Sequence, residues 1–342
     1  MDVWYETLID RGLVPESIIR KLLRLGLRKY SARVRSLDCV ALSNVKRDFI
    51  LKSNLSPIAI DTDTANEQHY EVPAHFFGKF LSNSMKYSGS VWDSGVTSLD
   101  IADSRTLDLY IERADLKDGQ NVLELGSGWG SLCLHLARKH PNSQIKSVTN
   151  SKTQKEFIDA QAKNLALRNL VVLQSDIKYF QDSSKYDRIV SIEMFEHLRS
   201  PIKILEKTFD WLCEDGKLFF QVFSHKEFPQ YFDDKKNSWM ARNFFTGGMM
   251  PYDGFYEDIT DQLTLENKWL ISGMNYHKTL ESWLYRLKNN QREILKMRET
   301  YSEIDYVKSI NQFKIFIIFC SELFKFNNGN DWQLIHYLFL KK

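Results

Sequence analysis

The chain has 342 residues, of which 43% are hydrophobic and 13% aromatic, enough to fill the core of one large α/β domain and a smaller addition. Its 46 Lys and Arg residues nearly balance 44 Asp and Glu residues, so no overall field favours a nucleic acid and the expected partner is a small molecule. The four cysteines form no C-x-x-C pair, which argues against a metal site or a disulfide framework and favours a cytoplasmic protein with reduced thiols.

The first 85 residues are predicted to form an N-terminal helical extension. Apolar residues show helical spacing over 15–35 and 37–55, and a polar stretch over 61–69 is typical of a surface connection. The first 52 residues hold eleven Lys or Arg against six Asp or Glu, a charge that could touch an anionic membrane. We instead expect a solvated basic face on the first helix, whose opposite side packs on the core through Ile19, Leu22, Leu23 and Leu27. Spare apolar surface on the two helices makes a homodimer possible.

From about residue 100 the pattern alternates between helices and short apolar strands. Helices are expected over 103–114, 131–139, 152–164 and 203–213, and strands over 121–125, 144–149, 170–174, 186–192 and 216–223. This alternation predicts an α/β fold with a parallel, doubly wound sheet. Further helices are expected over 280–297 and 308–324, and a closing strand over 332–340.

Residues 226 to about 305 are expected to be a helical and irregular cap, inserted in a domain that spans residues 86–342. Over 226–270 the sequence shows no clean period, and a long irregular stretch in a compact domain is usually a lid or a binding wall. Its aromatic residues, such as Phe245 and Tyr256, could line a pocket for a planar or cationic amine. A nucleic-acid enzyme would need a basic groove, whereas this stretch carries Asp233, Asp234, Asp253, Glu257, Asp258 and Asp261.

The first strand of the alternation ends in a turn that contains Gly126, Gly128 and Gly130. Glycines there let backbone amides approach a ligand closely, and the start of the next helix favours an electronegative group. A dinucleotide-binding turn would place two residues between its second and third glycines, but this turn places one. Glu124 lies where methyltransferases commonly put an acid near the methionine end of S-adenosylmethionine. The turn therefore predicts an S-adenosylmethionine site.

Polar residues follow the second and third strands, at the edge where a bound nucleotide would lie. Asn150 and Gln154 come after the second strand and are candidates for hydrogen bonds to a ribose. Asp176 and Ile177 come after the third strand, where an acid can hold the adenine amino group and an apolar neighbour can pack against its ring. An ordinary role as a loop acid is the alternative for Asp176.

Two carboxylates and an imidazole follow the fourth strand, as Glu193, Glu196 and His197. Methyl transfer from a sulfonium needs a neutral amine that is held close and freed of its proton. Glu196 and His197 are the expected proton acceptor, with the carboxylate orienting the imidazole, and Glu193 is expected to hold a cationic amine. One of the acids could instead only cap the next helix. His225, after the fifth strand, either faces the same cavity or is a loop histidine without a role.

Short motifs recur along much of the chain: Tyr70-Glu-Val-Pro73, Phe76-Phe77, Lys86-Tyr-Ser-Gly89, Leu125-Gly-Ser-Gly-Trp-Gly130, Thr149-Asn-Ser-Lys-Thr-Gln154, Ile192-Glu-Met-Phe-Glu-His197 and Asn327-Asn-Gly-Asn-Asp-Trp332. With them, residues 65–342 resemble the coclaurine N-methyltransferase-like proteins of the cyclopropane fatty acid synthase superfamily. The resemblance implies a Rossmann-like, seven-stranded class I methyltransferase sheet and Glu196 with His197 as the catalytic pair. It implies an S-adenosylmethionine site lined by Tyr87, Ser88, Gly126, Gly128, Asn150, Gln154, Asp176, Ile177 and Val190.

The alternative function is lipid cyclopropanation, because the cyclopropane synthases resemble this chain as well. Those synthases bind bicarbonate as the base, partly through a cysteine in a Tyr-Ser-Cys stretch, whereas this chain has Tyr87-Ser88-Gly89. The positions of other important residues in the synthases are occupied here by Glu196, His225, Tyr276 and Cys320. Cys320 is therefore a further catalytic candidate, and the candidates for substrate contact are His225, Phe245 and Tyr276. The missing cysteine favours methylation of a small-molecule amine, and membrane contact is expected only under the lipid alternative.

Overall fold

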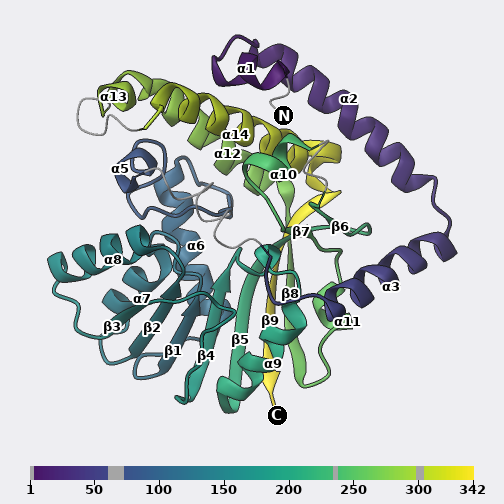
Figure 1. The fold of residues 1–342 in the computed structure, drawn as a ribbon. Helices are drawn as coiled ribbons and strands as arrows, with labels where there is room; N and C mark the ends of the chain where they lie inside the picture. The colour runs from purple at the N-terminus through teal and green to yellow at the C-terminus, as the bar shows by residue number, and fades with distance from the viewer. Residues whose placement is uncertain (1–3, 61–72, 234–237, 298–303) are drawn as a thin grey trace.

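The computed structural model describes residues 4–60, 73–233, 238–297 and 304–342 (Figure 1). The predicted polar connection at 61–69, the first three residues of the Tyr70-Glu-Val-Pro73 motif and Asp234 lie outside these ranges. Within the ranges, no helix is long and apolar enough to cross a membrane.

A seven-stranded sheet forms the centre of the molecule (Figure 1). Its strands are β1 (Asn121–Leu125), β2 (Gln144–Thr149), β3 (Leu170–Gln174), β4 (Tyr186–Ile192), β5 (Leu212–His225), β8 (Leu263–Ser272) and β9 (Trp332–Lys341). In the order β3-β2-β1-β4-β5-β9-β8, the first five strands pair in parallel, as the alternating pattern predicts. β9 runs antiparallel to both of its neighbours, so the sheet is mixed rather than wholly parallel.

β8 is the sheet strand that the sequence pattern does not reveal. It lies at the edge of the sheet, and a register shift between Leu265 and Asn267 interrupts the two-residue alternation of its side chains. The stretch from 226 to 270 is therefore less irregular than predicted. It also contains β6 (Gln230–Tyr231), α10 (Trp239–Asn243), β7 (Met249–Met250) and α11 (Phe255–Asp258).

Helices cover both faces of the parallel part of the sheet (Figure 1). Alternate side chains of β1 point to opposite faces, so that Val122 and Leu123 belong to different cores. Val122 packs with residues of α6 (Leu99–Arg113), α7 (Ser131–Lys139) and α8 (Lys152–Asn164), and Leu123 packs with residues of α9 (Pro201–Trp211). This layering fixes the strands, and their carboxyl ends meet at one edge of the sheet.

A helical cap stands above this carboxyl edge, built from α12 (Gly273–Asn289), α13 (Gln291–Lys296) and α14 (Tyr306–Gly329) (Figure 1). The helix predicted over 280–297 begins earlier, at Gly273, and is divided after Asn289. Near the end of α14, Asn327 and Asn328 have left-handed backbone angles, with φ of 49° and 55°. Asn tolerates this conformation better than most residues, so the Asn327-Asn-Gly motif serves as the turn that leads into β9.

The N-terminal extension consists of α1 (Trp4–Asp10), α2 (Glu16–Arg35) and α3 (Cys39–Leu55). α1 and α2 pack against α14, whereas α3 packs against α9. Arg20 and Arg24 of α2 donate hydrogen bonds of 2.8 and 2.6 Å to the buried carboxylate of Glu322 on α14. The extension therefore braces the cap.

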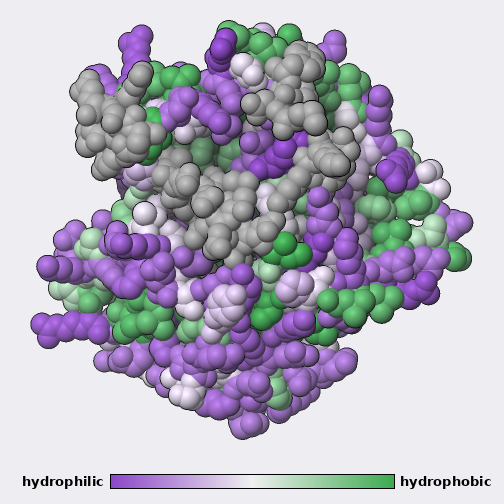
Figure 2. Space-filling model, in the orientation of Figure 1, coloured by the Kyte–Doolittle hydropathy of each residue, from purple (hydrophilic) through white to green (hydrophobic). Residues whose placement is uncertain are grey.

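The two long N-terminal helices also expose apolar side chains. Ile19, Leu23 and Leu27 pack on the core as predicted, but Leu22 is 61% exposed because it points outward beside Ile18 and Leu25. Figure 2 shows apolar side chains over α3 at the right of the view, where the exposed residues are Val40, Leu51 and Leu55. The spare apolar surface expected on these helices is present.

The last part of the predicted extension, before residue 85, belongs to the core beneath the cap. The short helix α5 (Ala74–Phe77) buries Phe76 and Phe77 completely, and Phe80 follows them. The Phe76 ring lies 5.2 Å from the Phe313 ring of α14. Residues 73–85 thus pack together with the domain that follows them.

Candidate active site

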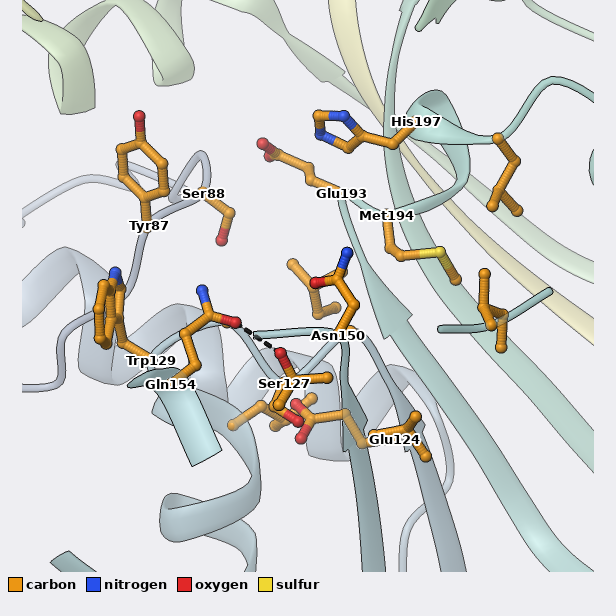
Figure 3. Close-up of a pocket in the computed structure, with 18 of the residues that line it drawn as sticks. Tyr87, Ser88, Glu124, Ser127, Trp129, Asn150, Gln154, Glu193, Met194 and His197 are labelled. Atoms are coloured by element: carbon orange, nitrogen blue, oxygen red, sulfur yellow. Dashed lines mark hydrogen bonds between the residues drawn. The ribbon is translucent and has the colours of Figure 1, made fainter. Parts of the chain in front are cut away.

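A cavity lies at the carboxyl edge of the sheet, beside the ends of β1, β2, β3 and β4 (Figure 3). Most of the predicted site residues line it, namely Tyr87, Ser88, Gly126, Gly128, Asn150, Gln154, Asp176, Ile177, Glu193 and His197. The described part of the lining holds three carboxylates, those of Glu124, Asp176 and Glu193, and no Lys or Arg. Such a lining attracts cations and repels anionic groups.

The glycine turn after β1 forms one wall of the cavity. The amides of Gly126 and Ser127 both donate to the Val148 carbonyl at 3.0 Å, which ties the turn to β2. Gly126 has φ of +87°, and a Cβ there would lie 3.0 Å from the Met194 side chain. Only glycine accommodates both conditions without strain, so the turn keeps its backbone open to a ligand.

Glu124 lies behind the turn and is almost completely buried. It accepts a hydrogen bond from the Ser147 hydroxyl, which lies 2.6 Å from the Ser127 hydroxyl. Burial raises the pKa of Glu124 to about 7, because a charge is poorly solvated there. A cation bound in the cavity would favour the ionised form of this carboxyl.

Gln154 presents a buried amide to the cavity (Figure 3). Its Oε1 accepts a 2.6 Å hydrogen bond from the Thr149 hydroxyl. Its Nε2 is buried and has no hydrogen-bond partner within the part of the chain that the structure describes. An unsatisfied buried donor costs about 1–3 kcal/mol, which a ligand oxygen would recover.

These features fit S-adenosylmethionine, which joins a nucleoside to an amino acid through a positive sulfonium. The glycine turn and Glu124 suit the amino acid end, and Asn150 with Gln154 suits the ribose. Asp176 and Ile177 lie at the end of β3, where the adenine is expected. Among the observations, the unpaired amide of Gln154 tests the fit most directly, because the ribose hydroxyls can accept its hydrogen bonds.

Glu193 follows β4 and has an unusual backbone. Its φ is +49°, a left-handed conformation that costs a residue with a side chain about 1–3 kcal/mol and is often found at functional sites. Oε1 accepts hydrogen bonds from the Gly89 amide at 2.9 Å and from Gln221 Nε2 at 2.6 Å, and Oε2 accepts one from the Tyr276 hydroxyl at 2.8 Å. Burial raises the pKa of Glu193, while nearby Lys86 and these donors oppose the rise.

His197 and Glu193 face the same space, across from Tyr87 and Ser88 (Figure 3). His197 ends the short helix η1 (Phe195–His197), and its ring lies 4.7 Å from the Phe245 ring. Glu193 and His197 are thus the acid and the imidazole that the structure brings together at the cavity.

Glu196 differs from its predicted placement, because it is fully buried and does not belong to the cavity lining. Its Oε1 accepts a 2.6 Å hydrogen bond from the Phe223 amide of β5, which fastens the η1 turn to the sheet. Burial and the neighbouring Glu193 raise the pKa of Glu196 far above its usual value. A carboxyl held this way resists ionisation and does not face the cavity, so it is poorly suited to accept a proton from a ligand there.

Tyr276 and Cys320 lie beside Glu193, on the cap helices α12 and α14. Tyr276 contacts Glu193 directly through the hydrogen bond from its hydroxyl. Cys320 lies close enough to Glu193 for that charge to help raise the pKa of its thiol, although burial is the main cause. The thiol is therefore protonated and unreactive near neutral pH.

Val190 and His225 lie outside the cavity lining. Val190 is in the middle of β4, opposite Glu124, and packs in the core beneath α6 and α7. The His225 ring packs against Trp332, and its Nδ1 accepts hydrogen bonds from the amides of Glu227 and Phe228 at 3.0 and 2.8 Å. His225 therefore stabilises the turn after β5, and Val190 is a core residue that does not belong to the described cavity lining.

The described residues of the cap insert do not form the aromatic and acidic wall that its composition predicts. Tyr252, Phe255 and Tyr256 belong to a core cluster beneath the sheet. Three of the described acids form ion pairs: Asp233 binds Lys52 and Arg199, and Asp253 and Glu257 bind Lys268. Asp258 accepts a hydrogen bond from the Tyr252 hydroxyl. Thr246 is the insert residue that reaches the cavity within the described chain.

Several polar residues that the sequence does not predict support the site. Gln221 is the lone amide in the apolar strand segment Leu218–Phe223, which is the signal that could have revealed it. Lys86 is fully buried, and its Nζ donates to the carbonyls of Ser88 and Gly89 at 3.1 and 2.7 Å. It thereby shapes the loop that faces Glu193.

Comparison with known proteins relates the chain to two enzyme classes. Residues 60–334 match the family described as mycolic acid cyclopropane synthetase. An (S)-coclaurine N-methyltransferase of Thalictrum flavum subsp. glaucum is 34% identical over 98% of this chain and 94% of its own length. The cyclopropane-fatty-acyl-phospholipid synthase of Escherichia coli (strain K12) is 25% identical over 98% of this chain and 80% of its own length.

A solved structure agrees with the whole chain. The crystal structure of a coclaurine N-methyltransferase bound to N-methylheliamine and SAH has a TM-score of 0.93 and 32% sequence identity, and the match covers 98% of both chains. The mixed sheet, the cap and the N-terminal helices are therefore all shared with that protein.

Proposed function

Because the chain belongs to the mycolic acid cyclopropane synthetase family and, within it, to the coclaurine N-methyltransferase-like enzymes, we infer that it is an S-adenosylmethionine-dependent N-methyltransferase of a small-molecule amine. The observation that carries the proposal is the Glu193 carboxylate, which three donors hold beside His197 in a cavity whose described lining has no cationic side chain. This arrangement favours a ligand that is positively charged before it reacts.

S-adenosylmethionine supplies the methyl group when it is bound. The glycine turn at Gly126 and Gly128 can hold its amino acid end, with Glu124 behind the turn. The buried amide of Gln154 can donate to the ribose. The carboxylates of the cavity attract the positive sulfonium of S-adenosylmethionine more strongly than the neutral sulfide of S-adenosylhomocysteine. This difference helps the product to leave.

Glu193 provides the place for the amine. An ionised carboxylate in this cavity attracts an ammonium group, and the three donors leave its orientation fixed. The strained backbone of Glu193 supports this assignment, because such strain is retained where it serves a site. Because the carboxylate holds the amine in a fixed orientation, less entropy is lost when the nitrogen is aligned for the reaction.

The bound amine must lose its proton before the nitrogen can react. We assign His197 as the acceptor of that proton, since its ring lines the cavity beside Glu193. Glu196 acts in this proposal as a positioning residue, because it fastens the turn that carries His197 to the amide of Phe223. The pair predicted from the sequence is thus divided into one group that faces the amine and one that holds the turn.

Gly89 favours N-methylation over cyclopropanation of lipids. A Cβ at Gly89 would lie 2.7 Å from Leu334 Cδ1 and 3.0 Å from the Tyr276 ring. A cysteine at this position, as the resemblance gives for the synthases, would therefore collide with the tyrosine that binds Glu193. A phospholipid would also bring its phosphate towards a cavity whose described lining holds three carboxyl groups and no Lys or Arg.

The proposed function can be tested with a methyl-labelled donor. The purified protein is incubated with labelled S-adenosylmethionine and a panel of small amines that includes coclaurine, and separately with vesicles of unsaturated phospholipid. We expect label on the nitrogen of at least one amine and none in the acyl chains. Label in the lipid, or no transfer together with no binding of the donor, would overturn the proposal.

A further inference from the structure

We propose that Gln221 and His336 are positioning residues for Glu193. Arg113, at the protein surface, fixes the direction of the hydrogen bonds that run from His336 through Gln221 to Glu193. This inference rests on the proposed function, because it assigns a purpose to the Glu193 carboxylate. Arg113 lies in α6 and lines a surface depression, whereas Glu193 lines the cavity. The hydrogen bonds therefore join the surface depression beside α6 to the cavity at the carboxyl edge of the sheet.

The two central residues form an unusual polar pair. Gln221 of β5 and His336 of β9 are opposite each other in the antiparallel register, and both are completely buried. Their strand neighbours are apolar, and include Phe220, Val222 and Ile335. A buried polar pair costs free energy unless its hydrogen bonds are satisfied, so two apolar residues would serve the core equally well.

The direction of the hydrogen bonds follows from what each group can do. Arg113 Nη1 lies 2.8 Å from His336 Nδ1, and a guanidinium can only donate. His336 Nδ1 must therefore accept, so the neutral ring carries its proton on Nε2. Burial, Arg113 and Lys86 lower the pKa of His336 far below its usual value, which agrees with a neutral ring. Nε2 then donates to Gln221 Oε1 at 2.7 Å.

The amide of Gln221 is thereby oriented. Its Oε1 also accepts a 2.8 Å hydrogen bond from the Tyr110 hydroxyl, so two donors hold the oxygen on one side. Its Nε2 must face the other way, where it donates to Glu193 Oε1 at 2.6 Å and to the Gly89 carbonyl at 3.3 Å. The reverse orientation would place the amide oxygen against a carboxylate and a carbonyl, which are both acceptors.

The consequence is a carboxylate whose hydrogen-bond partners among the described residues, Gly89, Gln221 and Tyr276, are all donors. Oε1 of Glu193 receives the amides of Gly89 and Gln221, and Oε2 receives the Tyr276 hydroxyl. Hydrogen bonds to the charged form lower the pKa of a carboxyl and oppose the effect of burial. The ionisable groups that surround Glu193 are Lys86, Tyr110, Glu196, His197, Tyr276 and Cys320. Of these, Lys86 favours the charged form of Glu193, and Glu193 in turn raises the pKa of Glu196.

A kinetic experiment separates this positioning role from a structural one. In Gln221→Met and His336→Leu, the acidic limb of the profile of kcat/KM against pH should move to higher pH by about one unit, because Glu193 loses a donor or its orientation. KM for S-adenosylmethionine should stay within about twofold of the wild-type value, since neither residue lines the cavity. His336→Gln keeps a donor towards Gln221 and should return the limb towards its wild-type position. His140→Leu is the matched control, because His140 is also buried but lies at the end of α7.

A second measurement, on the wild-type protein and one variant, does not depend on activity. Nitrogen-15 spectra of labelled histidine should show His336 as a neutral ring protonated on Nε2 from about pH 6 to 9, and Arg113→Met should allow the other tautomer to appear. A proton on Nδ1 in the wild-type protein, or an unmoved acidic limb in Gln221→Met, would refute the inference. A wild-type protein that methylates no amine would instead refute the proposed function, and the spectra would still decide the tautomer.

Discussion

The backbone amide of Gly89 donates a 2.9 Å hydrogen bond to Oε1 of Glu193. The bond joins the loop at Ser88 to the end of β4, two segments that are 104 residues apart in sequence. Lys86 holds the same loop through the Gly89 carbonyl at 2.7 Å. The position of the carboxylate therefore depends on both segments, and so does its use as the amine site.

Replacing the carboxylate should abolish most of the activity while leaving the fold intact. In Glu193→Gln, the side-chain amide would face the donors on Gly89, Gln221 and Tyr276, and the attraction for an ammonium would be lost. We expect kcat/KM for the amine to fall about a hundredfold or more. Steady-state kinetics measure this loss, and calorimetry should show nearly normal binding of S-adenosylmethionine. Wild-type kinetics in the variant would contradict the assignment of Glu193.

The roles of His197 and Glu196 can be separated by a pair of variants. His197→Ala removes the proposed proton acceptor and should lower kcat by about 10²–10⁴-fold. Glu196→Gln keeps an acceptor for the Phe223 amide and should cost much less than Glu196→Ala. The comparison is made at saturating donor and amine. If Glu196→Gln is as damaging as His197→Ala, then Glu196 takes part in the chemistry, as the sequence predicts.

Filling the space at Gly89 should damage the site rather than create a synthase. In Gly89→Cys the new side chain would meet the Tyr276 ring and Leu334, and such overpacking typically costs about 1–3 kcal/mol of stability. We expect a lower Tm, a loss of amine methylation and no transfer to unsaturated phospholipid. Thermal unfolding and the labelled-donor assay measure these effects. Gly95→Cys is a control, because the described structure leaves open space around Gly95. Because Gly95 has a φ of +82°, a cysteine there will strain the backbone and lower the Tm. The two variants are therefore compared by their methylation activity.

Binding of S-adenosylmethionine should release a proton from Glu124. Because burial raises the pKa of this carboxyl to about 7, the free protein holds it mostly protonated at about pH 6. A cation in the cavity lowers that pKa, so the proton leaves when the ligand binds, and the contribution of Glu124 to affinity grows as pH rises through about 7. Calorimetry in buffers of different ionisation enthalpy measures the release. Equal release in wild type and Glu124→Gln would show that the proton comes from elsewhere.

Gln154 should contribute to the same binding through its amide. Gln154→Leu keeps the approximate size of the side chain but removes the buried Nε2 donor. We expect the affinity for S-adenosylmethionine to fall about tenfold, in line with one lost hydrogen bond to a ligand. An unchanged Kd in the variant would mean that the ribose is held by other groups.

Much of the fold follows from local patterns in the sequence. The strands β1 to β4 and the helices α7 and α8 lie at the residues predicted, because short apolar runs with glycine or polar ends specify buried parallel strands. β8 was not foreseen, since a bulge at Leu265 and Asn267 removes its alternation. The antiparallel direction of β9 depends on how the chain returns to the sheet through α14, and no local sequence pattern predicts that connection.

The residues proposed to bind the cofactor follow from the sequence more directly than the residues proposed for catalysis. Asn150, Gln154 and Asp176 follow strand ends, and strand ends in a parallel sheet meet at one edge. By contrast, the roles of Glu193 and Glu196 depend on the left-handed backbone at Glu193, which turns the first side chain to the cavity and leaves the second buried. Gln221 and His336 meet only through the pairing of β5 with β9, so their connection to the site is visible in three dimensions alone.

A crystal structure of the protein with S-adenosylhomocysteine and an amine that it methylates would show whether Glu193 binds the amine. We expect the amine nitrogen within hydrogen-bond distance of the Glu193 carboxylate, with His197 beside it and Glu196 out of contact. An amine bound away from Glu193, or one whose nitrogen is held by Glu196 or His225, would contradict the assignment of Glu193 as the amine site.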